Sequence, residues 1–369
     1  MNALKPLSVY IHIPFCKSKC AYCDFASFPG REDAWEAYFA ALCTEIRAAA
    51  DGEHGVETVF FGGGTPSLVP EKYIGAALAA VREAFPLAPG AEISLEANPG
   101  TLSMEKLRAW REMGINRLSI GVQSFDERLL REIGRIHTPE AEREAVHMAR
   151  AAEFENVSID LMYGLPGQDM AAWQNTLATA LSLPLEHISA YALIVEEGTP
   201  MAARASELPG EEEVLGMQRL ATRALAAAGF TRYEISNYAR AGFACRHNIV
   251  YWRRGEYRGF GCAAHSFFGG ERFANPAALD DYLAGGRGKE RERVGAEAAR
   301  EETLLLSTRM CEGLSLCAWR EAFGEDFLSG REARLERLHR AGLIEIADGF
   351  MRLTERGLEV QNAVVLELL

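Results

Sequence analysis

The sequence predicts an α/β fold built from repeated strand–helix units, followed by a small C-terminal domain. Six short runs rich in β-branched and aromatic residues alternate with longer segments whose apolar residues recur at the helical period. Such runs are typical of buried strands in a parallel sheet that is covered by helices and joined by right-handed crossovers. Six units within the first two thirds of the chain favour a barrel or partial barrel over an open two-sided sheet.

The six strands are expected at residues 8–13, 58–61, 92–96, 117–122, 157–163 and 187–193. After the first strand, an apolar helix face is formed by Trp35, Tyr38, Phe39, Leu42 and Ile46. The intervening segments are therefore expected to be amphipathic helices that cover the sheet.

Capping residues support these helix limits. Thr138 followed by Pro139 is typical of a helix N-terminus, because the hydroxyl accepts a backbone N–H and proline fits the first helical position. Gly114 and Gly229 stand where helices would end in the left-handed conformation.

The amino-acid composition of the chain changes at residues 285–290. This segment is glycine-rich and charged, which is typical of a linker. Helices are expected at 303–310, 315–323 and 329–341, with Gly342 as a helix end. Asp348-Gly349 between two alternating runs predicts a hairpin, so this part resembles a winged helix. Residues 300–369 carry nine basic and thirteen acidic residues, which favours a packing or regulatory role over DNA binding.

The overall composition restricts the class of protein further. The formal net charge of the 369-residue chain is −13, which argues against nucleic acid as a partner. The N-terminal residues lack the apolar core of a secretory signal, and no apolar run approaches the roughly 18 residues that span a bilayer. Eight cysteines in such a long chain, three of them clustered, indicate a reducing compartment, and we expect the cytoplasm.

The clustered cysteines are the most informative feature of the chain. Cys16, Cys20 and Cys23 are separated by four and three residues, and no fourth cysteine lies close by. An iron–sulfur cluster normally takes four cysteines, so three leave one iron open to a substrate or cofactor. A zinc site completed by His12 or a distant histidine is the structural alternative.

Polar residues recur where the expected strands end. Glycines 62–64 follow the second strand, Glu96 closes the third, and Gln123 follows the fourth. In a barrel of this type, function gathers at the carboxyl ends of the strands. Asp160 lies inside the fifth strand, where a carboxylate must be hydrogen-bonded or paired; a structural salt bridge is the alternative there.

These motifs together resemble the radical S-adenosylmethionine (SAM) superfamily, and within it the branch that contains oxygen-independent coproporphyrinogen III oxidase. The resemblance rests on YIHIPFC at 10–16 with the cysteine spacing, and on the segments at 62–67, 96–99, 121–125, 160–166 and 233–238. It implies a partial (β/α)6 radical-SAM barrel and a [4Fe–4S] cluster on Cys16, Cys20 and Cys23, whose fourth iron is chelated by SAM.

The resemblance also implies the positions that bind SAM. The residues that match the contacts to the cluster-bound SAM are Tyr10, Gly63 and Glu96. Those that match a second SAM site are Tyr22, Gly64, Thr65, Gln123, Arg135, Asp160 and Ala192. Arg135 is assigned only by its spacing from Gln123.

Two departures distinguish the chain from the oxidase. Phe25 stands where the oxidase has a fourth cysteine, and the first strand begins by about residue 8, without the N-terminal arm of the oxidase. The segment HNIVYW at 247–252 instead resembles the signature of HemW-type haem chaperones.

The haem signature joins an imidazole to two aromatic side chains. Imidazole is a common axial ligand of haem iron, and aromatic rings pack against the porphyrin plane. The resemblance therefore implies a haem site formed by His247, Asn248, Tyr251 and Trp252, with His247 on the iron. A hydrogen-bonded core histidine is the alternative, and Cys245 and His265 are further candidates near this site.

The sequence thus predicts three parts: a radical-SAM barrel at 1–240, a haem-motif segment and linker at 241–290, and a winged-helix-like domain at 291–369. The expected function is that of a cytoplasmic, peripherally membrane-associated haem chaperone that delivers haem to acceptor apoproteins such as membrane-bound respiratory enzymes. Whether SAM is cleaved and whether the chain forms a homodimer stay open. A radical-SAM enzyme acting on coproporphyrinogen III or another porphyrin is the second hypothesis, and a zinc-stabilised binding protein is the third.

Overall fold

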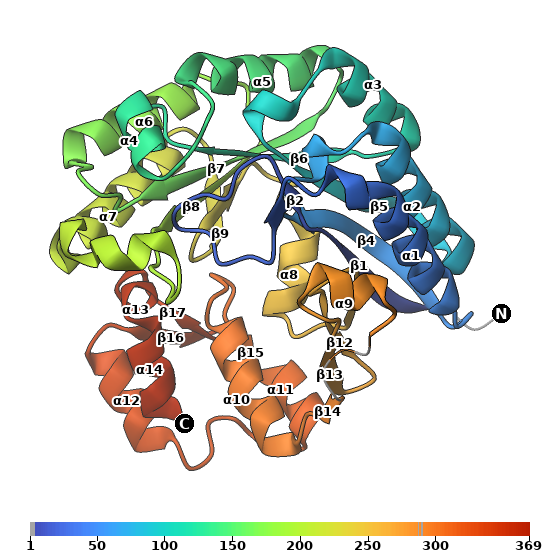
Figure 1. Ribbon diagram of the computed structural model, residues 1–369. Helices are drawn as coiled ribbons and strands as arrows, with labels where there is room; N and C mark the ends of the chain where they lie inside the picture. The colour runs from blue at the N-terminus through green and yellow to red at the C-terminus, as the bar shows by residue number, and fades with distance from the viewer. Residues whose placement is uncertain (1–3, 287, 289–290) are drawn as a thin grey trace.

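The computed structural model describes residues 4–286, 288 and 291–369. Within them, the chain folds around a curved twelve-stranded sheet in the order β14-β13-β12-β11-β1-β4-β5-β6-β7-β8-β10-β9 (Figure 1). Its centre consists of six parallel strands: β1 (Lys5–Ile13), β4 (His54–Gly63), β5 (Leu87–Ala97), β6 (Arg117–Gln123), β7 (Asn156–Tyr163) and β8 (His187–Ala192). All six strands expected from the sequence are confirmed, and they form an open, partial barrel.

Helices connect the parallel strands and cover the outer face of the sheet (Figure 1). They are α1 (Trp35–Ala48), α2 (Glu71–Ala84), α3 (Met104–Met113), α4 (Glu127–Glu132), α5 (Pro139–Ala151), α6 (Met170–Leu181) and α7 (Glu211–Ala227). Short 3-10 turns follow several strands at Glu32–Ala34, Pro66–Leu68, Pro99–Thr101 and Pro200–Glu207. The face of α1 that carries Tyr38, Phe39, Leu42 and Ile46 is buried, as its spacing predicts.

The helix caps follow from local chemistry. The Thr138 hydroxyl accepts the N–H of Ala141 at the start of α5, directly before Pro139. Gly114 ends α3 at φ +94°, and Gly229 follows α7 at φ +84°, a region that side chains rarely adopt. These three predicted helix limits are confirmed.

Both edges of the sheet carry strands that the sequence did not reveal. On one side, β10 (Asn237–Ala239) and β9 (Thr231–Glu234) extend the sheet antiparallel to β8. On the other side, β11 (Tyr257–Phe260) pairs parallel with β1, and an antiparallel series follows: β12 (His265–Phe268), β13 (Glu271–Ala274) and β14 (Glu292–Arg293). These strands are too short and glycine-rich for an alternating pattern to reveal them.

Two short helices belong to the same region, α8 (Arg246–Trp252) and α9 (Leu279–Leu283). The linker expected at 285–290 includes positions 287, 289 and 290, which lie outside the described residues. The limits of the three predicted parts stay predictions, although strands of the segment 241–290 clearly belong to the main sheet.

The C-terminal part has its own small core. It contains α10 (Ala296–Ser307), α11 (Leu316–Phe323), α12 (Glu332–Arg340) and a three-stranded sheet of β15 (Leu314–Ser315), β17 (Phe350–Leu353) and β16 (Ile344–Ala347). The hairpin at Asp348-Gly349 is confirmed, with both residues at positive φ. The first predicted helix was misplaced, because α10 begins at residue 296, and the chain continues into α13 (Glu355–Glu359) and α14 (Gln361–Leu368).

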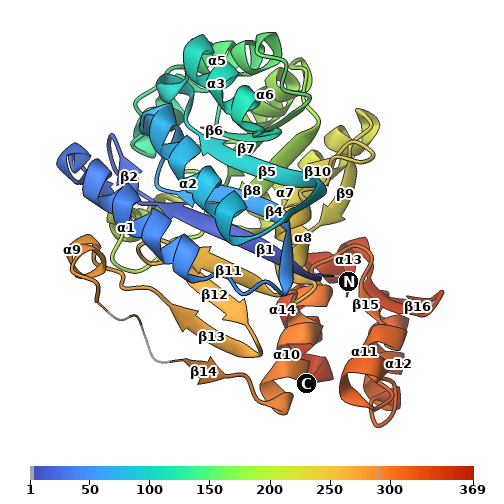
Figure 2. The ribbon, with the colours of Figure 1, turned by 90° about the vertical axis from the view of Figure 1, so that its right-hand side faces the viewer.

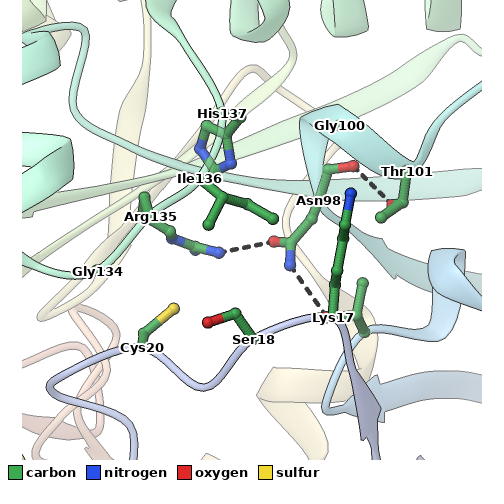
Figure 3. Close-up of a pocket in the computed structure, with 11 residues that line it drawn as sticks. Lys17, Ser18, Cys20, Asn98, Gly100, Thr101, Gly134, Arg135, Ile136 and His137 are labelled. Atoms are coloured by element: carbon green, nitrogen blue, oxygen red, sulfur yellow. Dashed lines mark hydrogen bonds between the residues drawn. The ribbon is translucent and has the colours of Figure 1, made fainter. Parts of the chain in front are cut away.

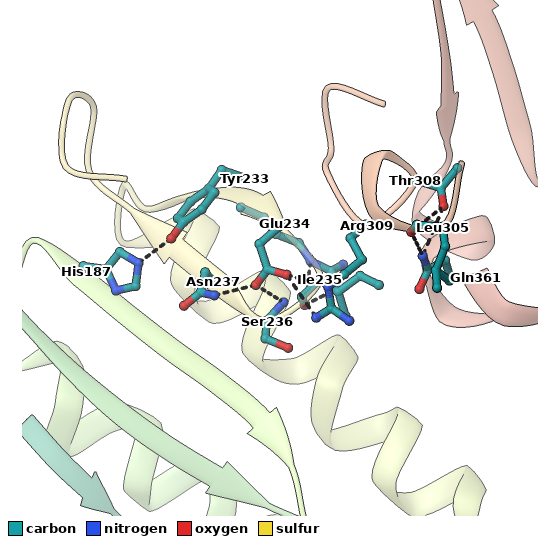
Figure 4. Close-up of polar contacts among 11 residues, drawn as sticks. His187, Tyr233, Glu234, Ile235, Ser236, Asn237, Leu305, Thr308, Arg309 and Gln361 are labelled. Atoms are coloured by element: carbon teal, nitrogen blue, oxygen red, sulfur yellow. Dashed lines mark hydrogen bonds and ion pairs between the residues drawn. The ribbon is translucent and has the colours of Figure 1, made fainter. Parts of the chain in front are cut away.

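The C-terminal part packs beside α8 at one end of the sheet (Figure 2). The contact centres on Glu234, which is fully buried and accepts hydrogen bonds from the Asn237 amide (2.6 Å) and the Ser236 N–H (2.8 Å). Arg309, just after α10, donates to the same carboxylate at 3.1 Å (Figure 4). Two of the four donors to this buried carboxylate belong to Arg309, so the ion pair joins the two parts, and loss of Arg309 would leave the buried charge without its cationic partner.

None of the helices described here is long and apolar enough to cross a membrane.

Candidate functional site

The three clustered cysteines lie on a loop between two short strands, β2 (Phe15–Cys16) and β3 (Phe28–Pro29). The loop is fixed by backbone hydrogen bonds, because the Ala21 N–H donates to the Ile133 carbonyl (3.1 Å) and the Met201 N–H donates to the Ala21 carbonyl (2.9 Å). All three thiols are free and half-buried. The loop therefore presents three cysteines from a backbone that is anchored to α4 and to the segment after β8.

The cysteines open into a cavity of about 330 Å³ at the carboxyl ends of the parallel strands, which we call the cysteine cavity. Twelve residues predicted from the sequence line it: Cys16, Cys20, Cys23, Tyr22, Gly63, Gly64, Thr65, Glu96, Gln123, Arg135, Asp160 and Asn248. The structure thus brings together segments more than 200 residues apart, as the parallel arrangement of the strands requires.

The glycine turn after β4 approaches the cysteine loop through its backbone. The Gly64 N–H donates to the Ile13 carbonyl (2.9 Å), and the Thr65 N–H donates to the Phe15 carbonyl (2.8 Å). A Cβ atom on Gly64 would lie only 2.8 Å from the Phe15 carbonyl oxygen. Gly63 adopts φ +109°, and a side chain there would strike the His12 ring. Both glycines are therefore required by close packing.

Two half-buried carboxyl groups, those of Glu96 and Asp160, face this cavity. The Gly63 N–H donates to Glu96 Oε2 at 3.2 Å, while burial and the neighbouring Asp160 raise the pKa of Glu96 to about 8. Burial likewise raises the pKa of Asp160, although hydrogen bonds from Ser189 and Ser119 oppose this shift. The charges of Arg117 and Arg135 also lower the pKa of Asp160, but within the described part of the chain neither forms an ion pair with it, so the structural salt bridge considered above is not found. Such a pair favours a cationic ligand, which would restore both charges.

The cysteine cavity is also lined by a positively charged residue, Arg135. Arg135 Nη1 donates to Asn98 Oδ1 (2.9 Å), and the Asn98 amide donates to Thr65 Oγ1 (3.0 Å), beside a small adjoining pocket (Figure 3). The Nε atom of Arg135 is buried without a partner among the described residues. A buried, unpaired guanidinium donor suits an anionic group such as a carboxylate.

Several residues of the cavity were not predicted. Tyr191 donates to Gln123 Oε1 at 3.0 Å, and Ser119 and Ser189 lie around Asp160. Asn98 was part of a recognised motif, but nothing in the sequence singled out Tyr191 or the serines. They are strand residues whose orientation depends on the pleat.

Two of the predicted SAM residues do not line the cysteine cavity. Ala192 is the last residue of β8 and is half-buried. Tyr10 lies on β1, its hydroxyl is 3.0 Å from His12 Nδ1, and it lines a second cavity. The side chains of Tyr10 and Glu96 are nevertheless close to each other, since a Cβ atom on Gly62 would lie 3.1 Å from both.

The second cavity has a volume of about 650 Å³ and lies between β1, α8, β12 and α10. We call it the aromatic cavity, because Tyr10, Phe25, Tyr251, Trp252, Tyr257 and Phe267 line it. Phe25 lines the cysteine cavity as well. The two cavities therefore share a lining residue, which follows the last cysteine of the triplet by two positions.

Helix α8 carries the predicted haem motif, and the residues of this motif face different cavities. Asn248 faces the cysteine cavity, whereas Tyr251 and Trp252 face the aromatic cavity. His247 is 1% exposed: its Nδ1 lies 2.7 Å from Thr58 Oγ1 and its Nε2 lies 2.7 Å from the Tyr251 hydroxyl. Burial, together with Arg117, lowers the pKa of His247 to about 3. The assignment of iron to His247 stays a prediction, and in this structure both ring nitrogens are already engaged.

The start of α8 depends on Glu92, which the sequence did not identify. Glu92 is 6% exposed, and its two carboxylate oxygens accept the N–H groups of Arg246 (3.0 Å) and His247 (3.1 Å). A carboxylate at this position satisfies N–H groups that a helix leaves unpaired, and it interacts favourably with the helix dipole. Its only signal in the sequence is a charged residue inside a buried strand.

The donors at the cysteine loop match an iron–sulfur cluster better than a single metal ion. Within the described ranges, no three His, Cys, Asp or Glu side chains converge as one ion requires. His12 cannot complete a zinc site as it stands, because its Nε2 lies 2.8 Å from the Ala26 carbonyl and its Nδ1 faces Tyr10. Three free thiols that line one cavity, with no fourth cysteine among the described residues that line it, suit a larger inorganic centre with one open iron.

Comparison with known proteins agrees with this geometry. Residues 10–180 match the radical SAM superfamily, and residues 295–360 match the HemN C-terminal domain. The solved structure of coproporphyrinogen III oxidase (HemN) from Escherichia coli superposes with a TM-score of 0.86 at 23% identity, over 99% of this chain and 90% of that one. The fold and the cysteine cavity thus define a radical SAM superfamily protein with a HemN-like C-terminal domain.

Similar curated proteins show which family of the radical SAM superfamily the chain belongs to. The protein named Heme chaperone HemW from Bacillus subtilis (strain 168) is 36% identical over 97% of both chains. The protein of the same name from Escherichia coli (strain K12) is 41% identical over 72% of this chain and 71% of its own. The chain belongs to the HemW family.

Proposed function

We propose that this chain is a haem chaperone that binds haem in the aromatic cavity and delivers it to acceptor apoproteins. Membership of the HemW family supports the proposal, since the curated relatives carry the name of heme chaperones. The observation that carries it furthest is that Phe25 lines both the cysteine cavity and the aromatic cavity. A chaperone with both a cluster and a porphyrin site requires two such adjoining spaces.

The cysteine cavity fits a [4Fe–4S] cluster on Cys16, Cys20 and Cys23, with SAM beside it. A cluster of this type, when bound, supplies low-potential electrons to the SAM sulfonium. The protein residues would provide the binding: the glycine turn allows close approach of the backbone, and the Glu96 carboxyl group, with Tyr10 beside it, would interact with the cationic part of SAM. Arg135, with its unpaired Nε, suits a carboxylate.

The second SAM site proposed from the family consists of Tyr22, Gly64, Thr65, Gln123, Arg135, Asp160 and Ala192. All but Ala192 line the same cavity, which supports the proposal for these six. Ala192, the last residue of β8, does not line this cavity.

The aromatic cavity has the size and walls that a porphyrin needs. Its volume of about 650 Å³ is in the range of roughly 300–1,000 Å³ for small-molecule sites. Tyr251 and Tyr257 pack edge to face at 4.6 Å, and Trp252 is held against the Arg309 guanidinium at 4.4 Å. These rings offer apolar contact to a flat macrocycle.

Delivery to membrane-bound respiratory enzymes, peripheral membrane association in the cytoplasm, and a homodimer are further parts of the proposal. Each is an expectation from the family resemblance alone. Haem transfer assays with apoprotein acceptors, liposome flotation and sedimentation analysis test the three in turn.

A second candidate function is a radical-SAM reaction on coproporphyrinogen III or another porphyrin. Gln123, Arg135 and Asp160 favour it, because all three line the cysteine cavity together. Phe25 disfavours it, because the oxidase has a fourth cysteine at this position.

Haem titration of anaerobically reconstituted protein tests the proposed function. We expect saturable haem binding, iron and acid-labile sulfide that disappear in Cys20→Ser but persist in Cys43→Ser, and no decarboxylation of coproporphyrinogen III with SAM and a reductant. Cys43 is buried in the main core, away from both cavities, and serves as the matched thiol. Absence of haem binding by the reconstituted protein would refute the chaperone function, and decarboxylated product would establish the enzyme instead.

A further inference from the structure

Two histidines, His12 and His265, line the aromatic cavity, and a third, His247, lies behind its wall against Tyr251. His12 and His247 are buried, and both ring nitrogens of each lie within 3.0 Å of a hydrogen-bonding partner. His265, the first residue of β12, is exposed and lines the cavity. No side-chain hydrogen bond among the described residues uses its imidazole. Of the three, only His265 presents an unengaged ring nitrogen to the space.

We infer that His265 supplies the protein ligand to haem iron in the aromatic cavity, and that His247 is a positioning residue that holds Tyr251. This inference rests on the proposed haem binding and assigns the ligand within that site. Neutral imidazole is a usual axial ligand for haem iron, and a donor that already faces the cavity binds iron without breaking other bonds.

Imidazole binds iron through one ring nitrogen, so each engaged histidine would have to give up one hydrogen bond before it could bind iron. For His247 the loss would also unpair either Thr58 or Tyr251 in a buried space, where an unsatisfied polar group costs about 1–3 kcal/mol. His247 further stacks on Phe60, with ring centroids 5.1 Å apart. The ring is thus held in the sheet interior on every side that the structure describes.

The nearby thiols do not compete for the iron. Cys245 is fully buried, and its Sγ faces the Glu92 carboxylate at 3.6 Å. Cys262 is also fully buried and points to the carbonyl groups of Pro276 and Ala277 at 3.3 Å. Neither residue lines the aromatic cavity. A larger cavity on the other side of α10 is lined by Trp319 and Phe323, but no histidine borders it.

The charge beside His265 suits the propionate groups of haem. Arg254 and Arg272 both line the aromatic cavity, and both pair with the single carboxylate of Glu302, Arg254 at 2.9 Å. Two guanidinium groups share one carboxylate at this side of the cavity, so they retain donors for an incoming anion, although Asp24 also lines the cavity. Both guanidiniums also lie over the Phe267 ring, which fixes their planes at one side of the cavity. Arginine binds carboxylates in a bidentate manner, so it favours a porphyrin with acidic side chains.

Titration of ferric haem into the full-length chain tests the assignment. We expect His265→Ala to shift the Soret band and lower haem affinity by more than about tenfold, since even supporting residues of a metal site commonly cost that much. His265→Cys should bind haem with the absorption and electron paramagnetic resonance spectra of thiolate ligation. This result would place position 265 on the iron directly, because a structural role does not change the ligand type.

Two further variants complete the comparison. His247→Gln, which retains hydrogen-bonding groups, should keep the wild-type iron spectrum, and His339→Ala, an exposed histidine on α12, should match the wild type throughout. Wild-type spectra in both His265 variants, or loss of the iron ligand in His247→Gln with an unchanged circular dichroism spectrum, would overturn the inference. Failure of the wild-type chain to bind haem is a different outcome, because it refutes the proposed function itself.

Discussion

Replacement of Glu92 by glutamine should loosen α8 without unfolding the barrel. In the wild type, both carboxylate oxygens of Glu92 accept N–H groups from the first turn of this helix, those of Arg246 and His247. The carboxylate also faces the buried guanidinium of Arg117, whose charge it helps to balance. Glutamine offers one oxygen acceptor, and its amide group would face a second donor.

The magnitude follows from the two hydrogen bonds. A hydrogen bond to a charged group contributes about 1.5–3 kcal/mol and a neutral one about 0.5–1.5 kcal/mol, so each bond loses about 1 kcal/mol. The variant should therefore lower the free energy of local opening of α8 by about 2 kcal/mol. This corresponds to roughly 30-fold faster amide exchange, given that each 1.4 kcal/mol is a factor of ten.

Hydrogen–deuterium exchange read by mass spectrometry on peptides that cover α8 measures this effect. Glu57→Gln is the matched control, since Glu57 is exposed on the neighbouring strand β4. Exchange in α8 that is as slow in Glu92→Gln as in the wild type would refute the view that this carboxylate anchors the helix. Faster exchange in Glu57→Gln would show that general sheet stability, not the cap, is responsible.

Three further predictions concern the domain contact and the cysteine cavity. Arg309→Ala should lower the free energy of unfolding by about 3–5 kcal/mol, because it leaves a buried carboxylate uncompensated, whereas Arg320→Ala in an exposed pair should change it by about 0–1 kcal/mol in urea unfolding. Gly64→Ala should cost about 1–3 kcal/mol and reduce iron content, while Gly100→Ala, whose added Cβ would lie 3.9 Å from its nearest neighbour, should do neither. The pKa of Glu96 is about 8, so binding of a cationic ligand such as SAM requires deprotonation of this carboxyl group. The affinity for SAM, measured by equilibrium dialysis, should therefore rise about tenfold from pH 7 to 9, and the Glu96→Gln variant should lose this pH dependence. Unchanged iron content in the first glycine variant, equal unfolding of the two arginine variants, or a flat pH profile in the wild type would contradict these expectations.

The cysteine cavity was largely predictable from the sequence. Parallel strands end at the same edge of a sheet, so Glu96, Gln123 and Asp160 were expected to meet once the strands were located. The cysteine spacing and the glycine turn are local patterns, and these depend little on the rest of the fold. The central strands and the helix caps were predictable for the same reason.

The aromatic cavity was not predictable, because distant segments build it. His247 finds its partner Thr58 across 189 positions, and Arg246 finds Glu92 across 154. The four-residue strands β11 to β13 carry too few residues for a period to emerge, yet they place His265 at the cavity wall. Burial of His247 was open in the sequence, since a histidine beside two aromatic residues is compatible with a ligand and with a core group alike.

The seven-residue helix α8 contributes to the walls of both cavities, since Asn248 lines the cysteine cavity and Tyr251 and Trp252 line the aromatic cavity. A short rigid helix moves as a unit. Any occupant that tilts it changes the walls of both cavities, and thermodynamic linkage makes the effect reciprocal: if filling one cavity strengthens retention in the other by some factor, the converse holds by the same factor. The affinity for a ligand in one cavity can thereby depend on whether the other cavity is occupied, through the movement of this one helix.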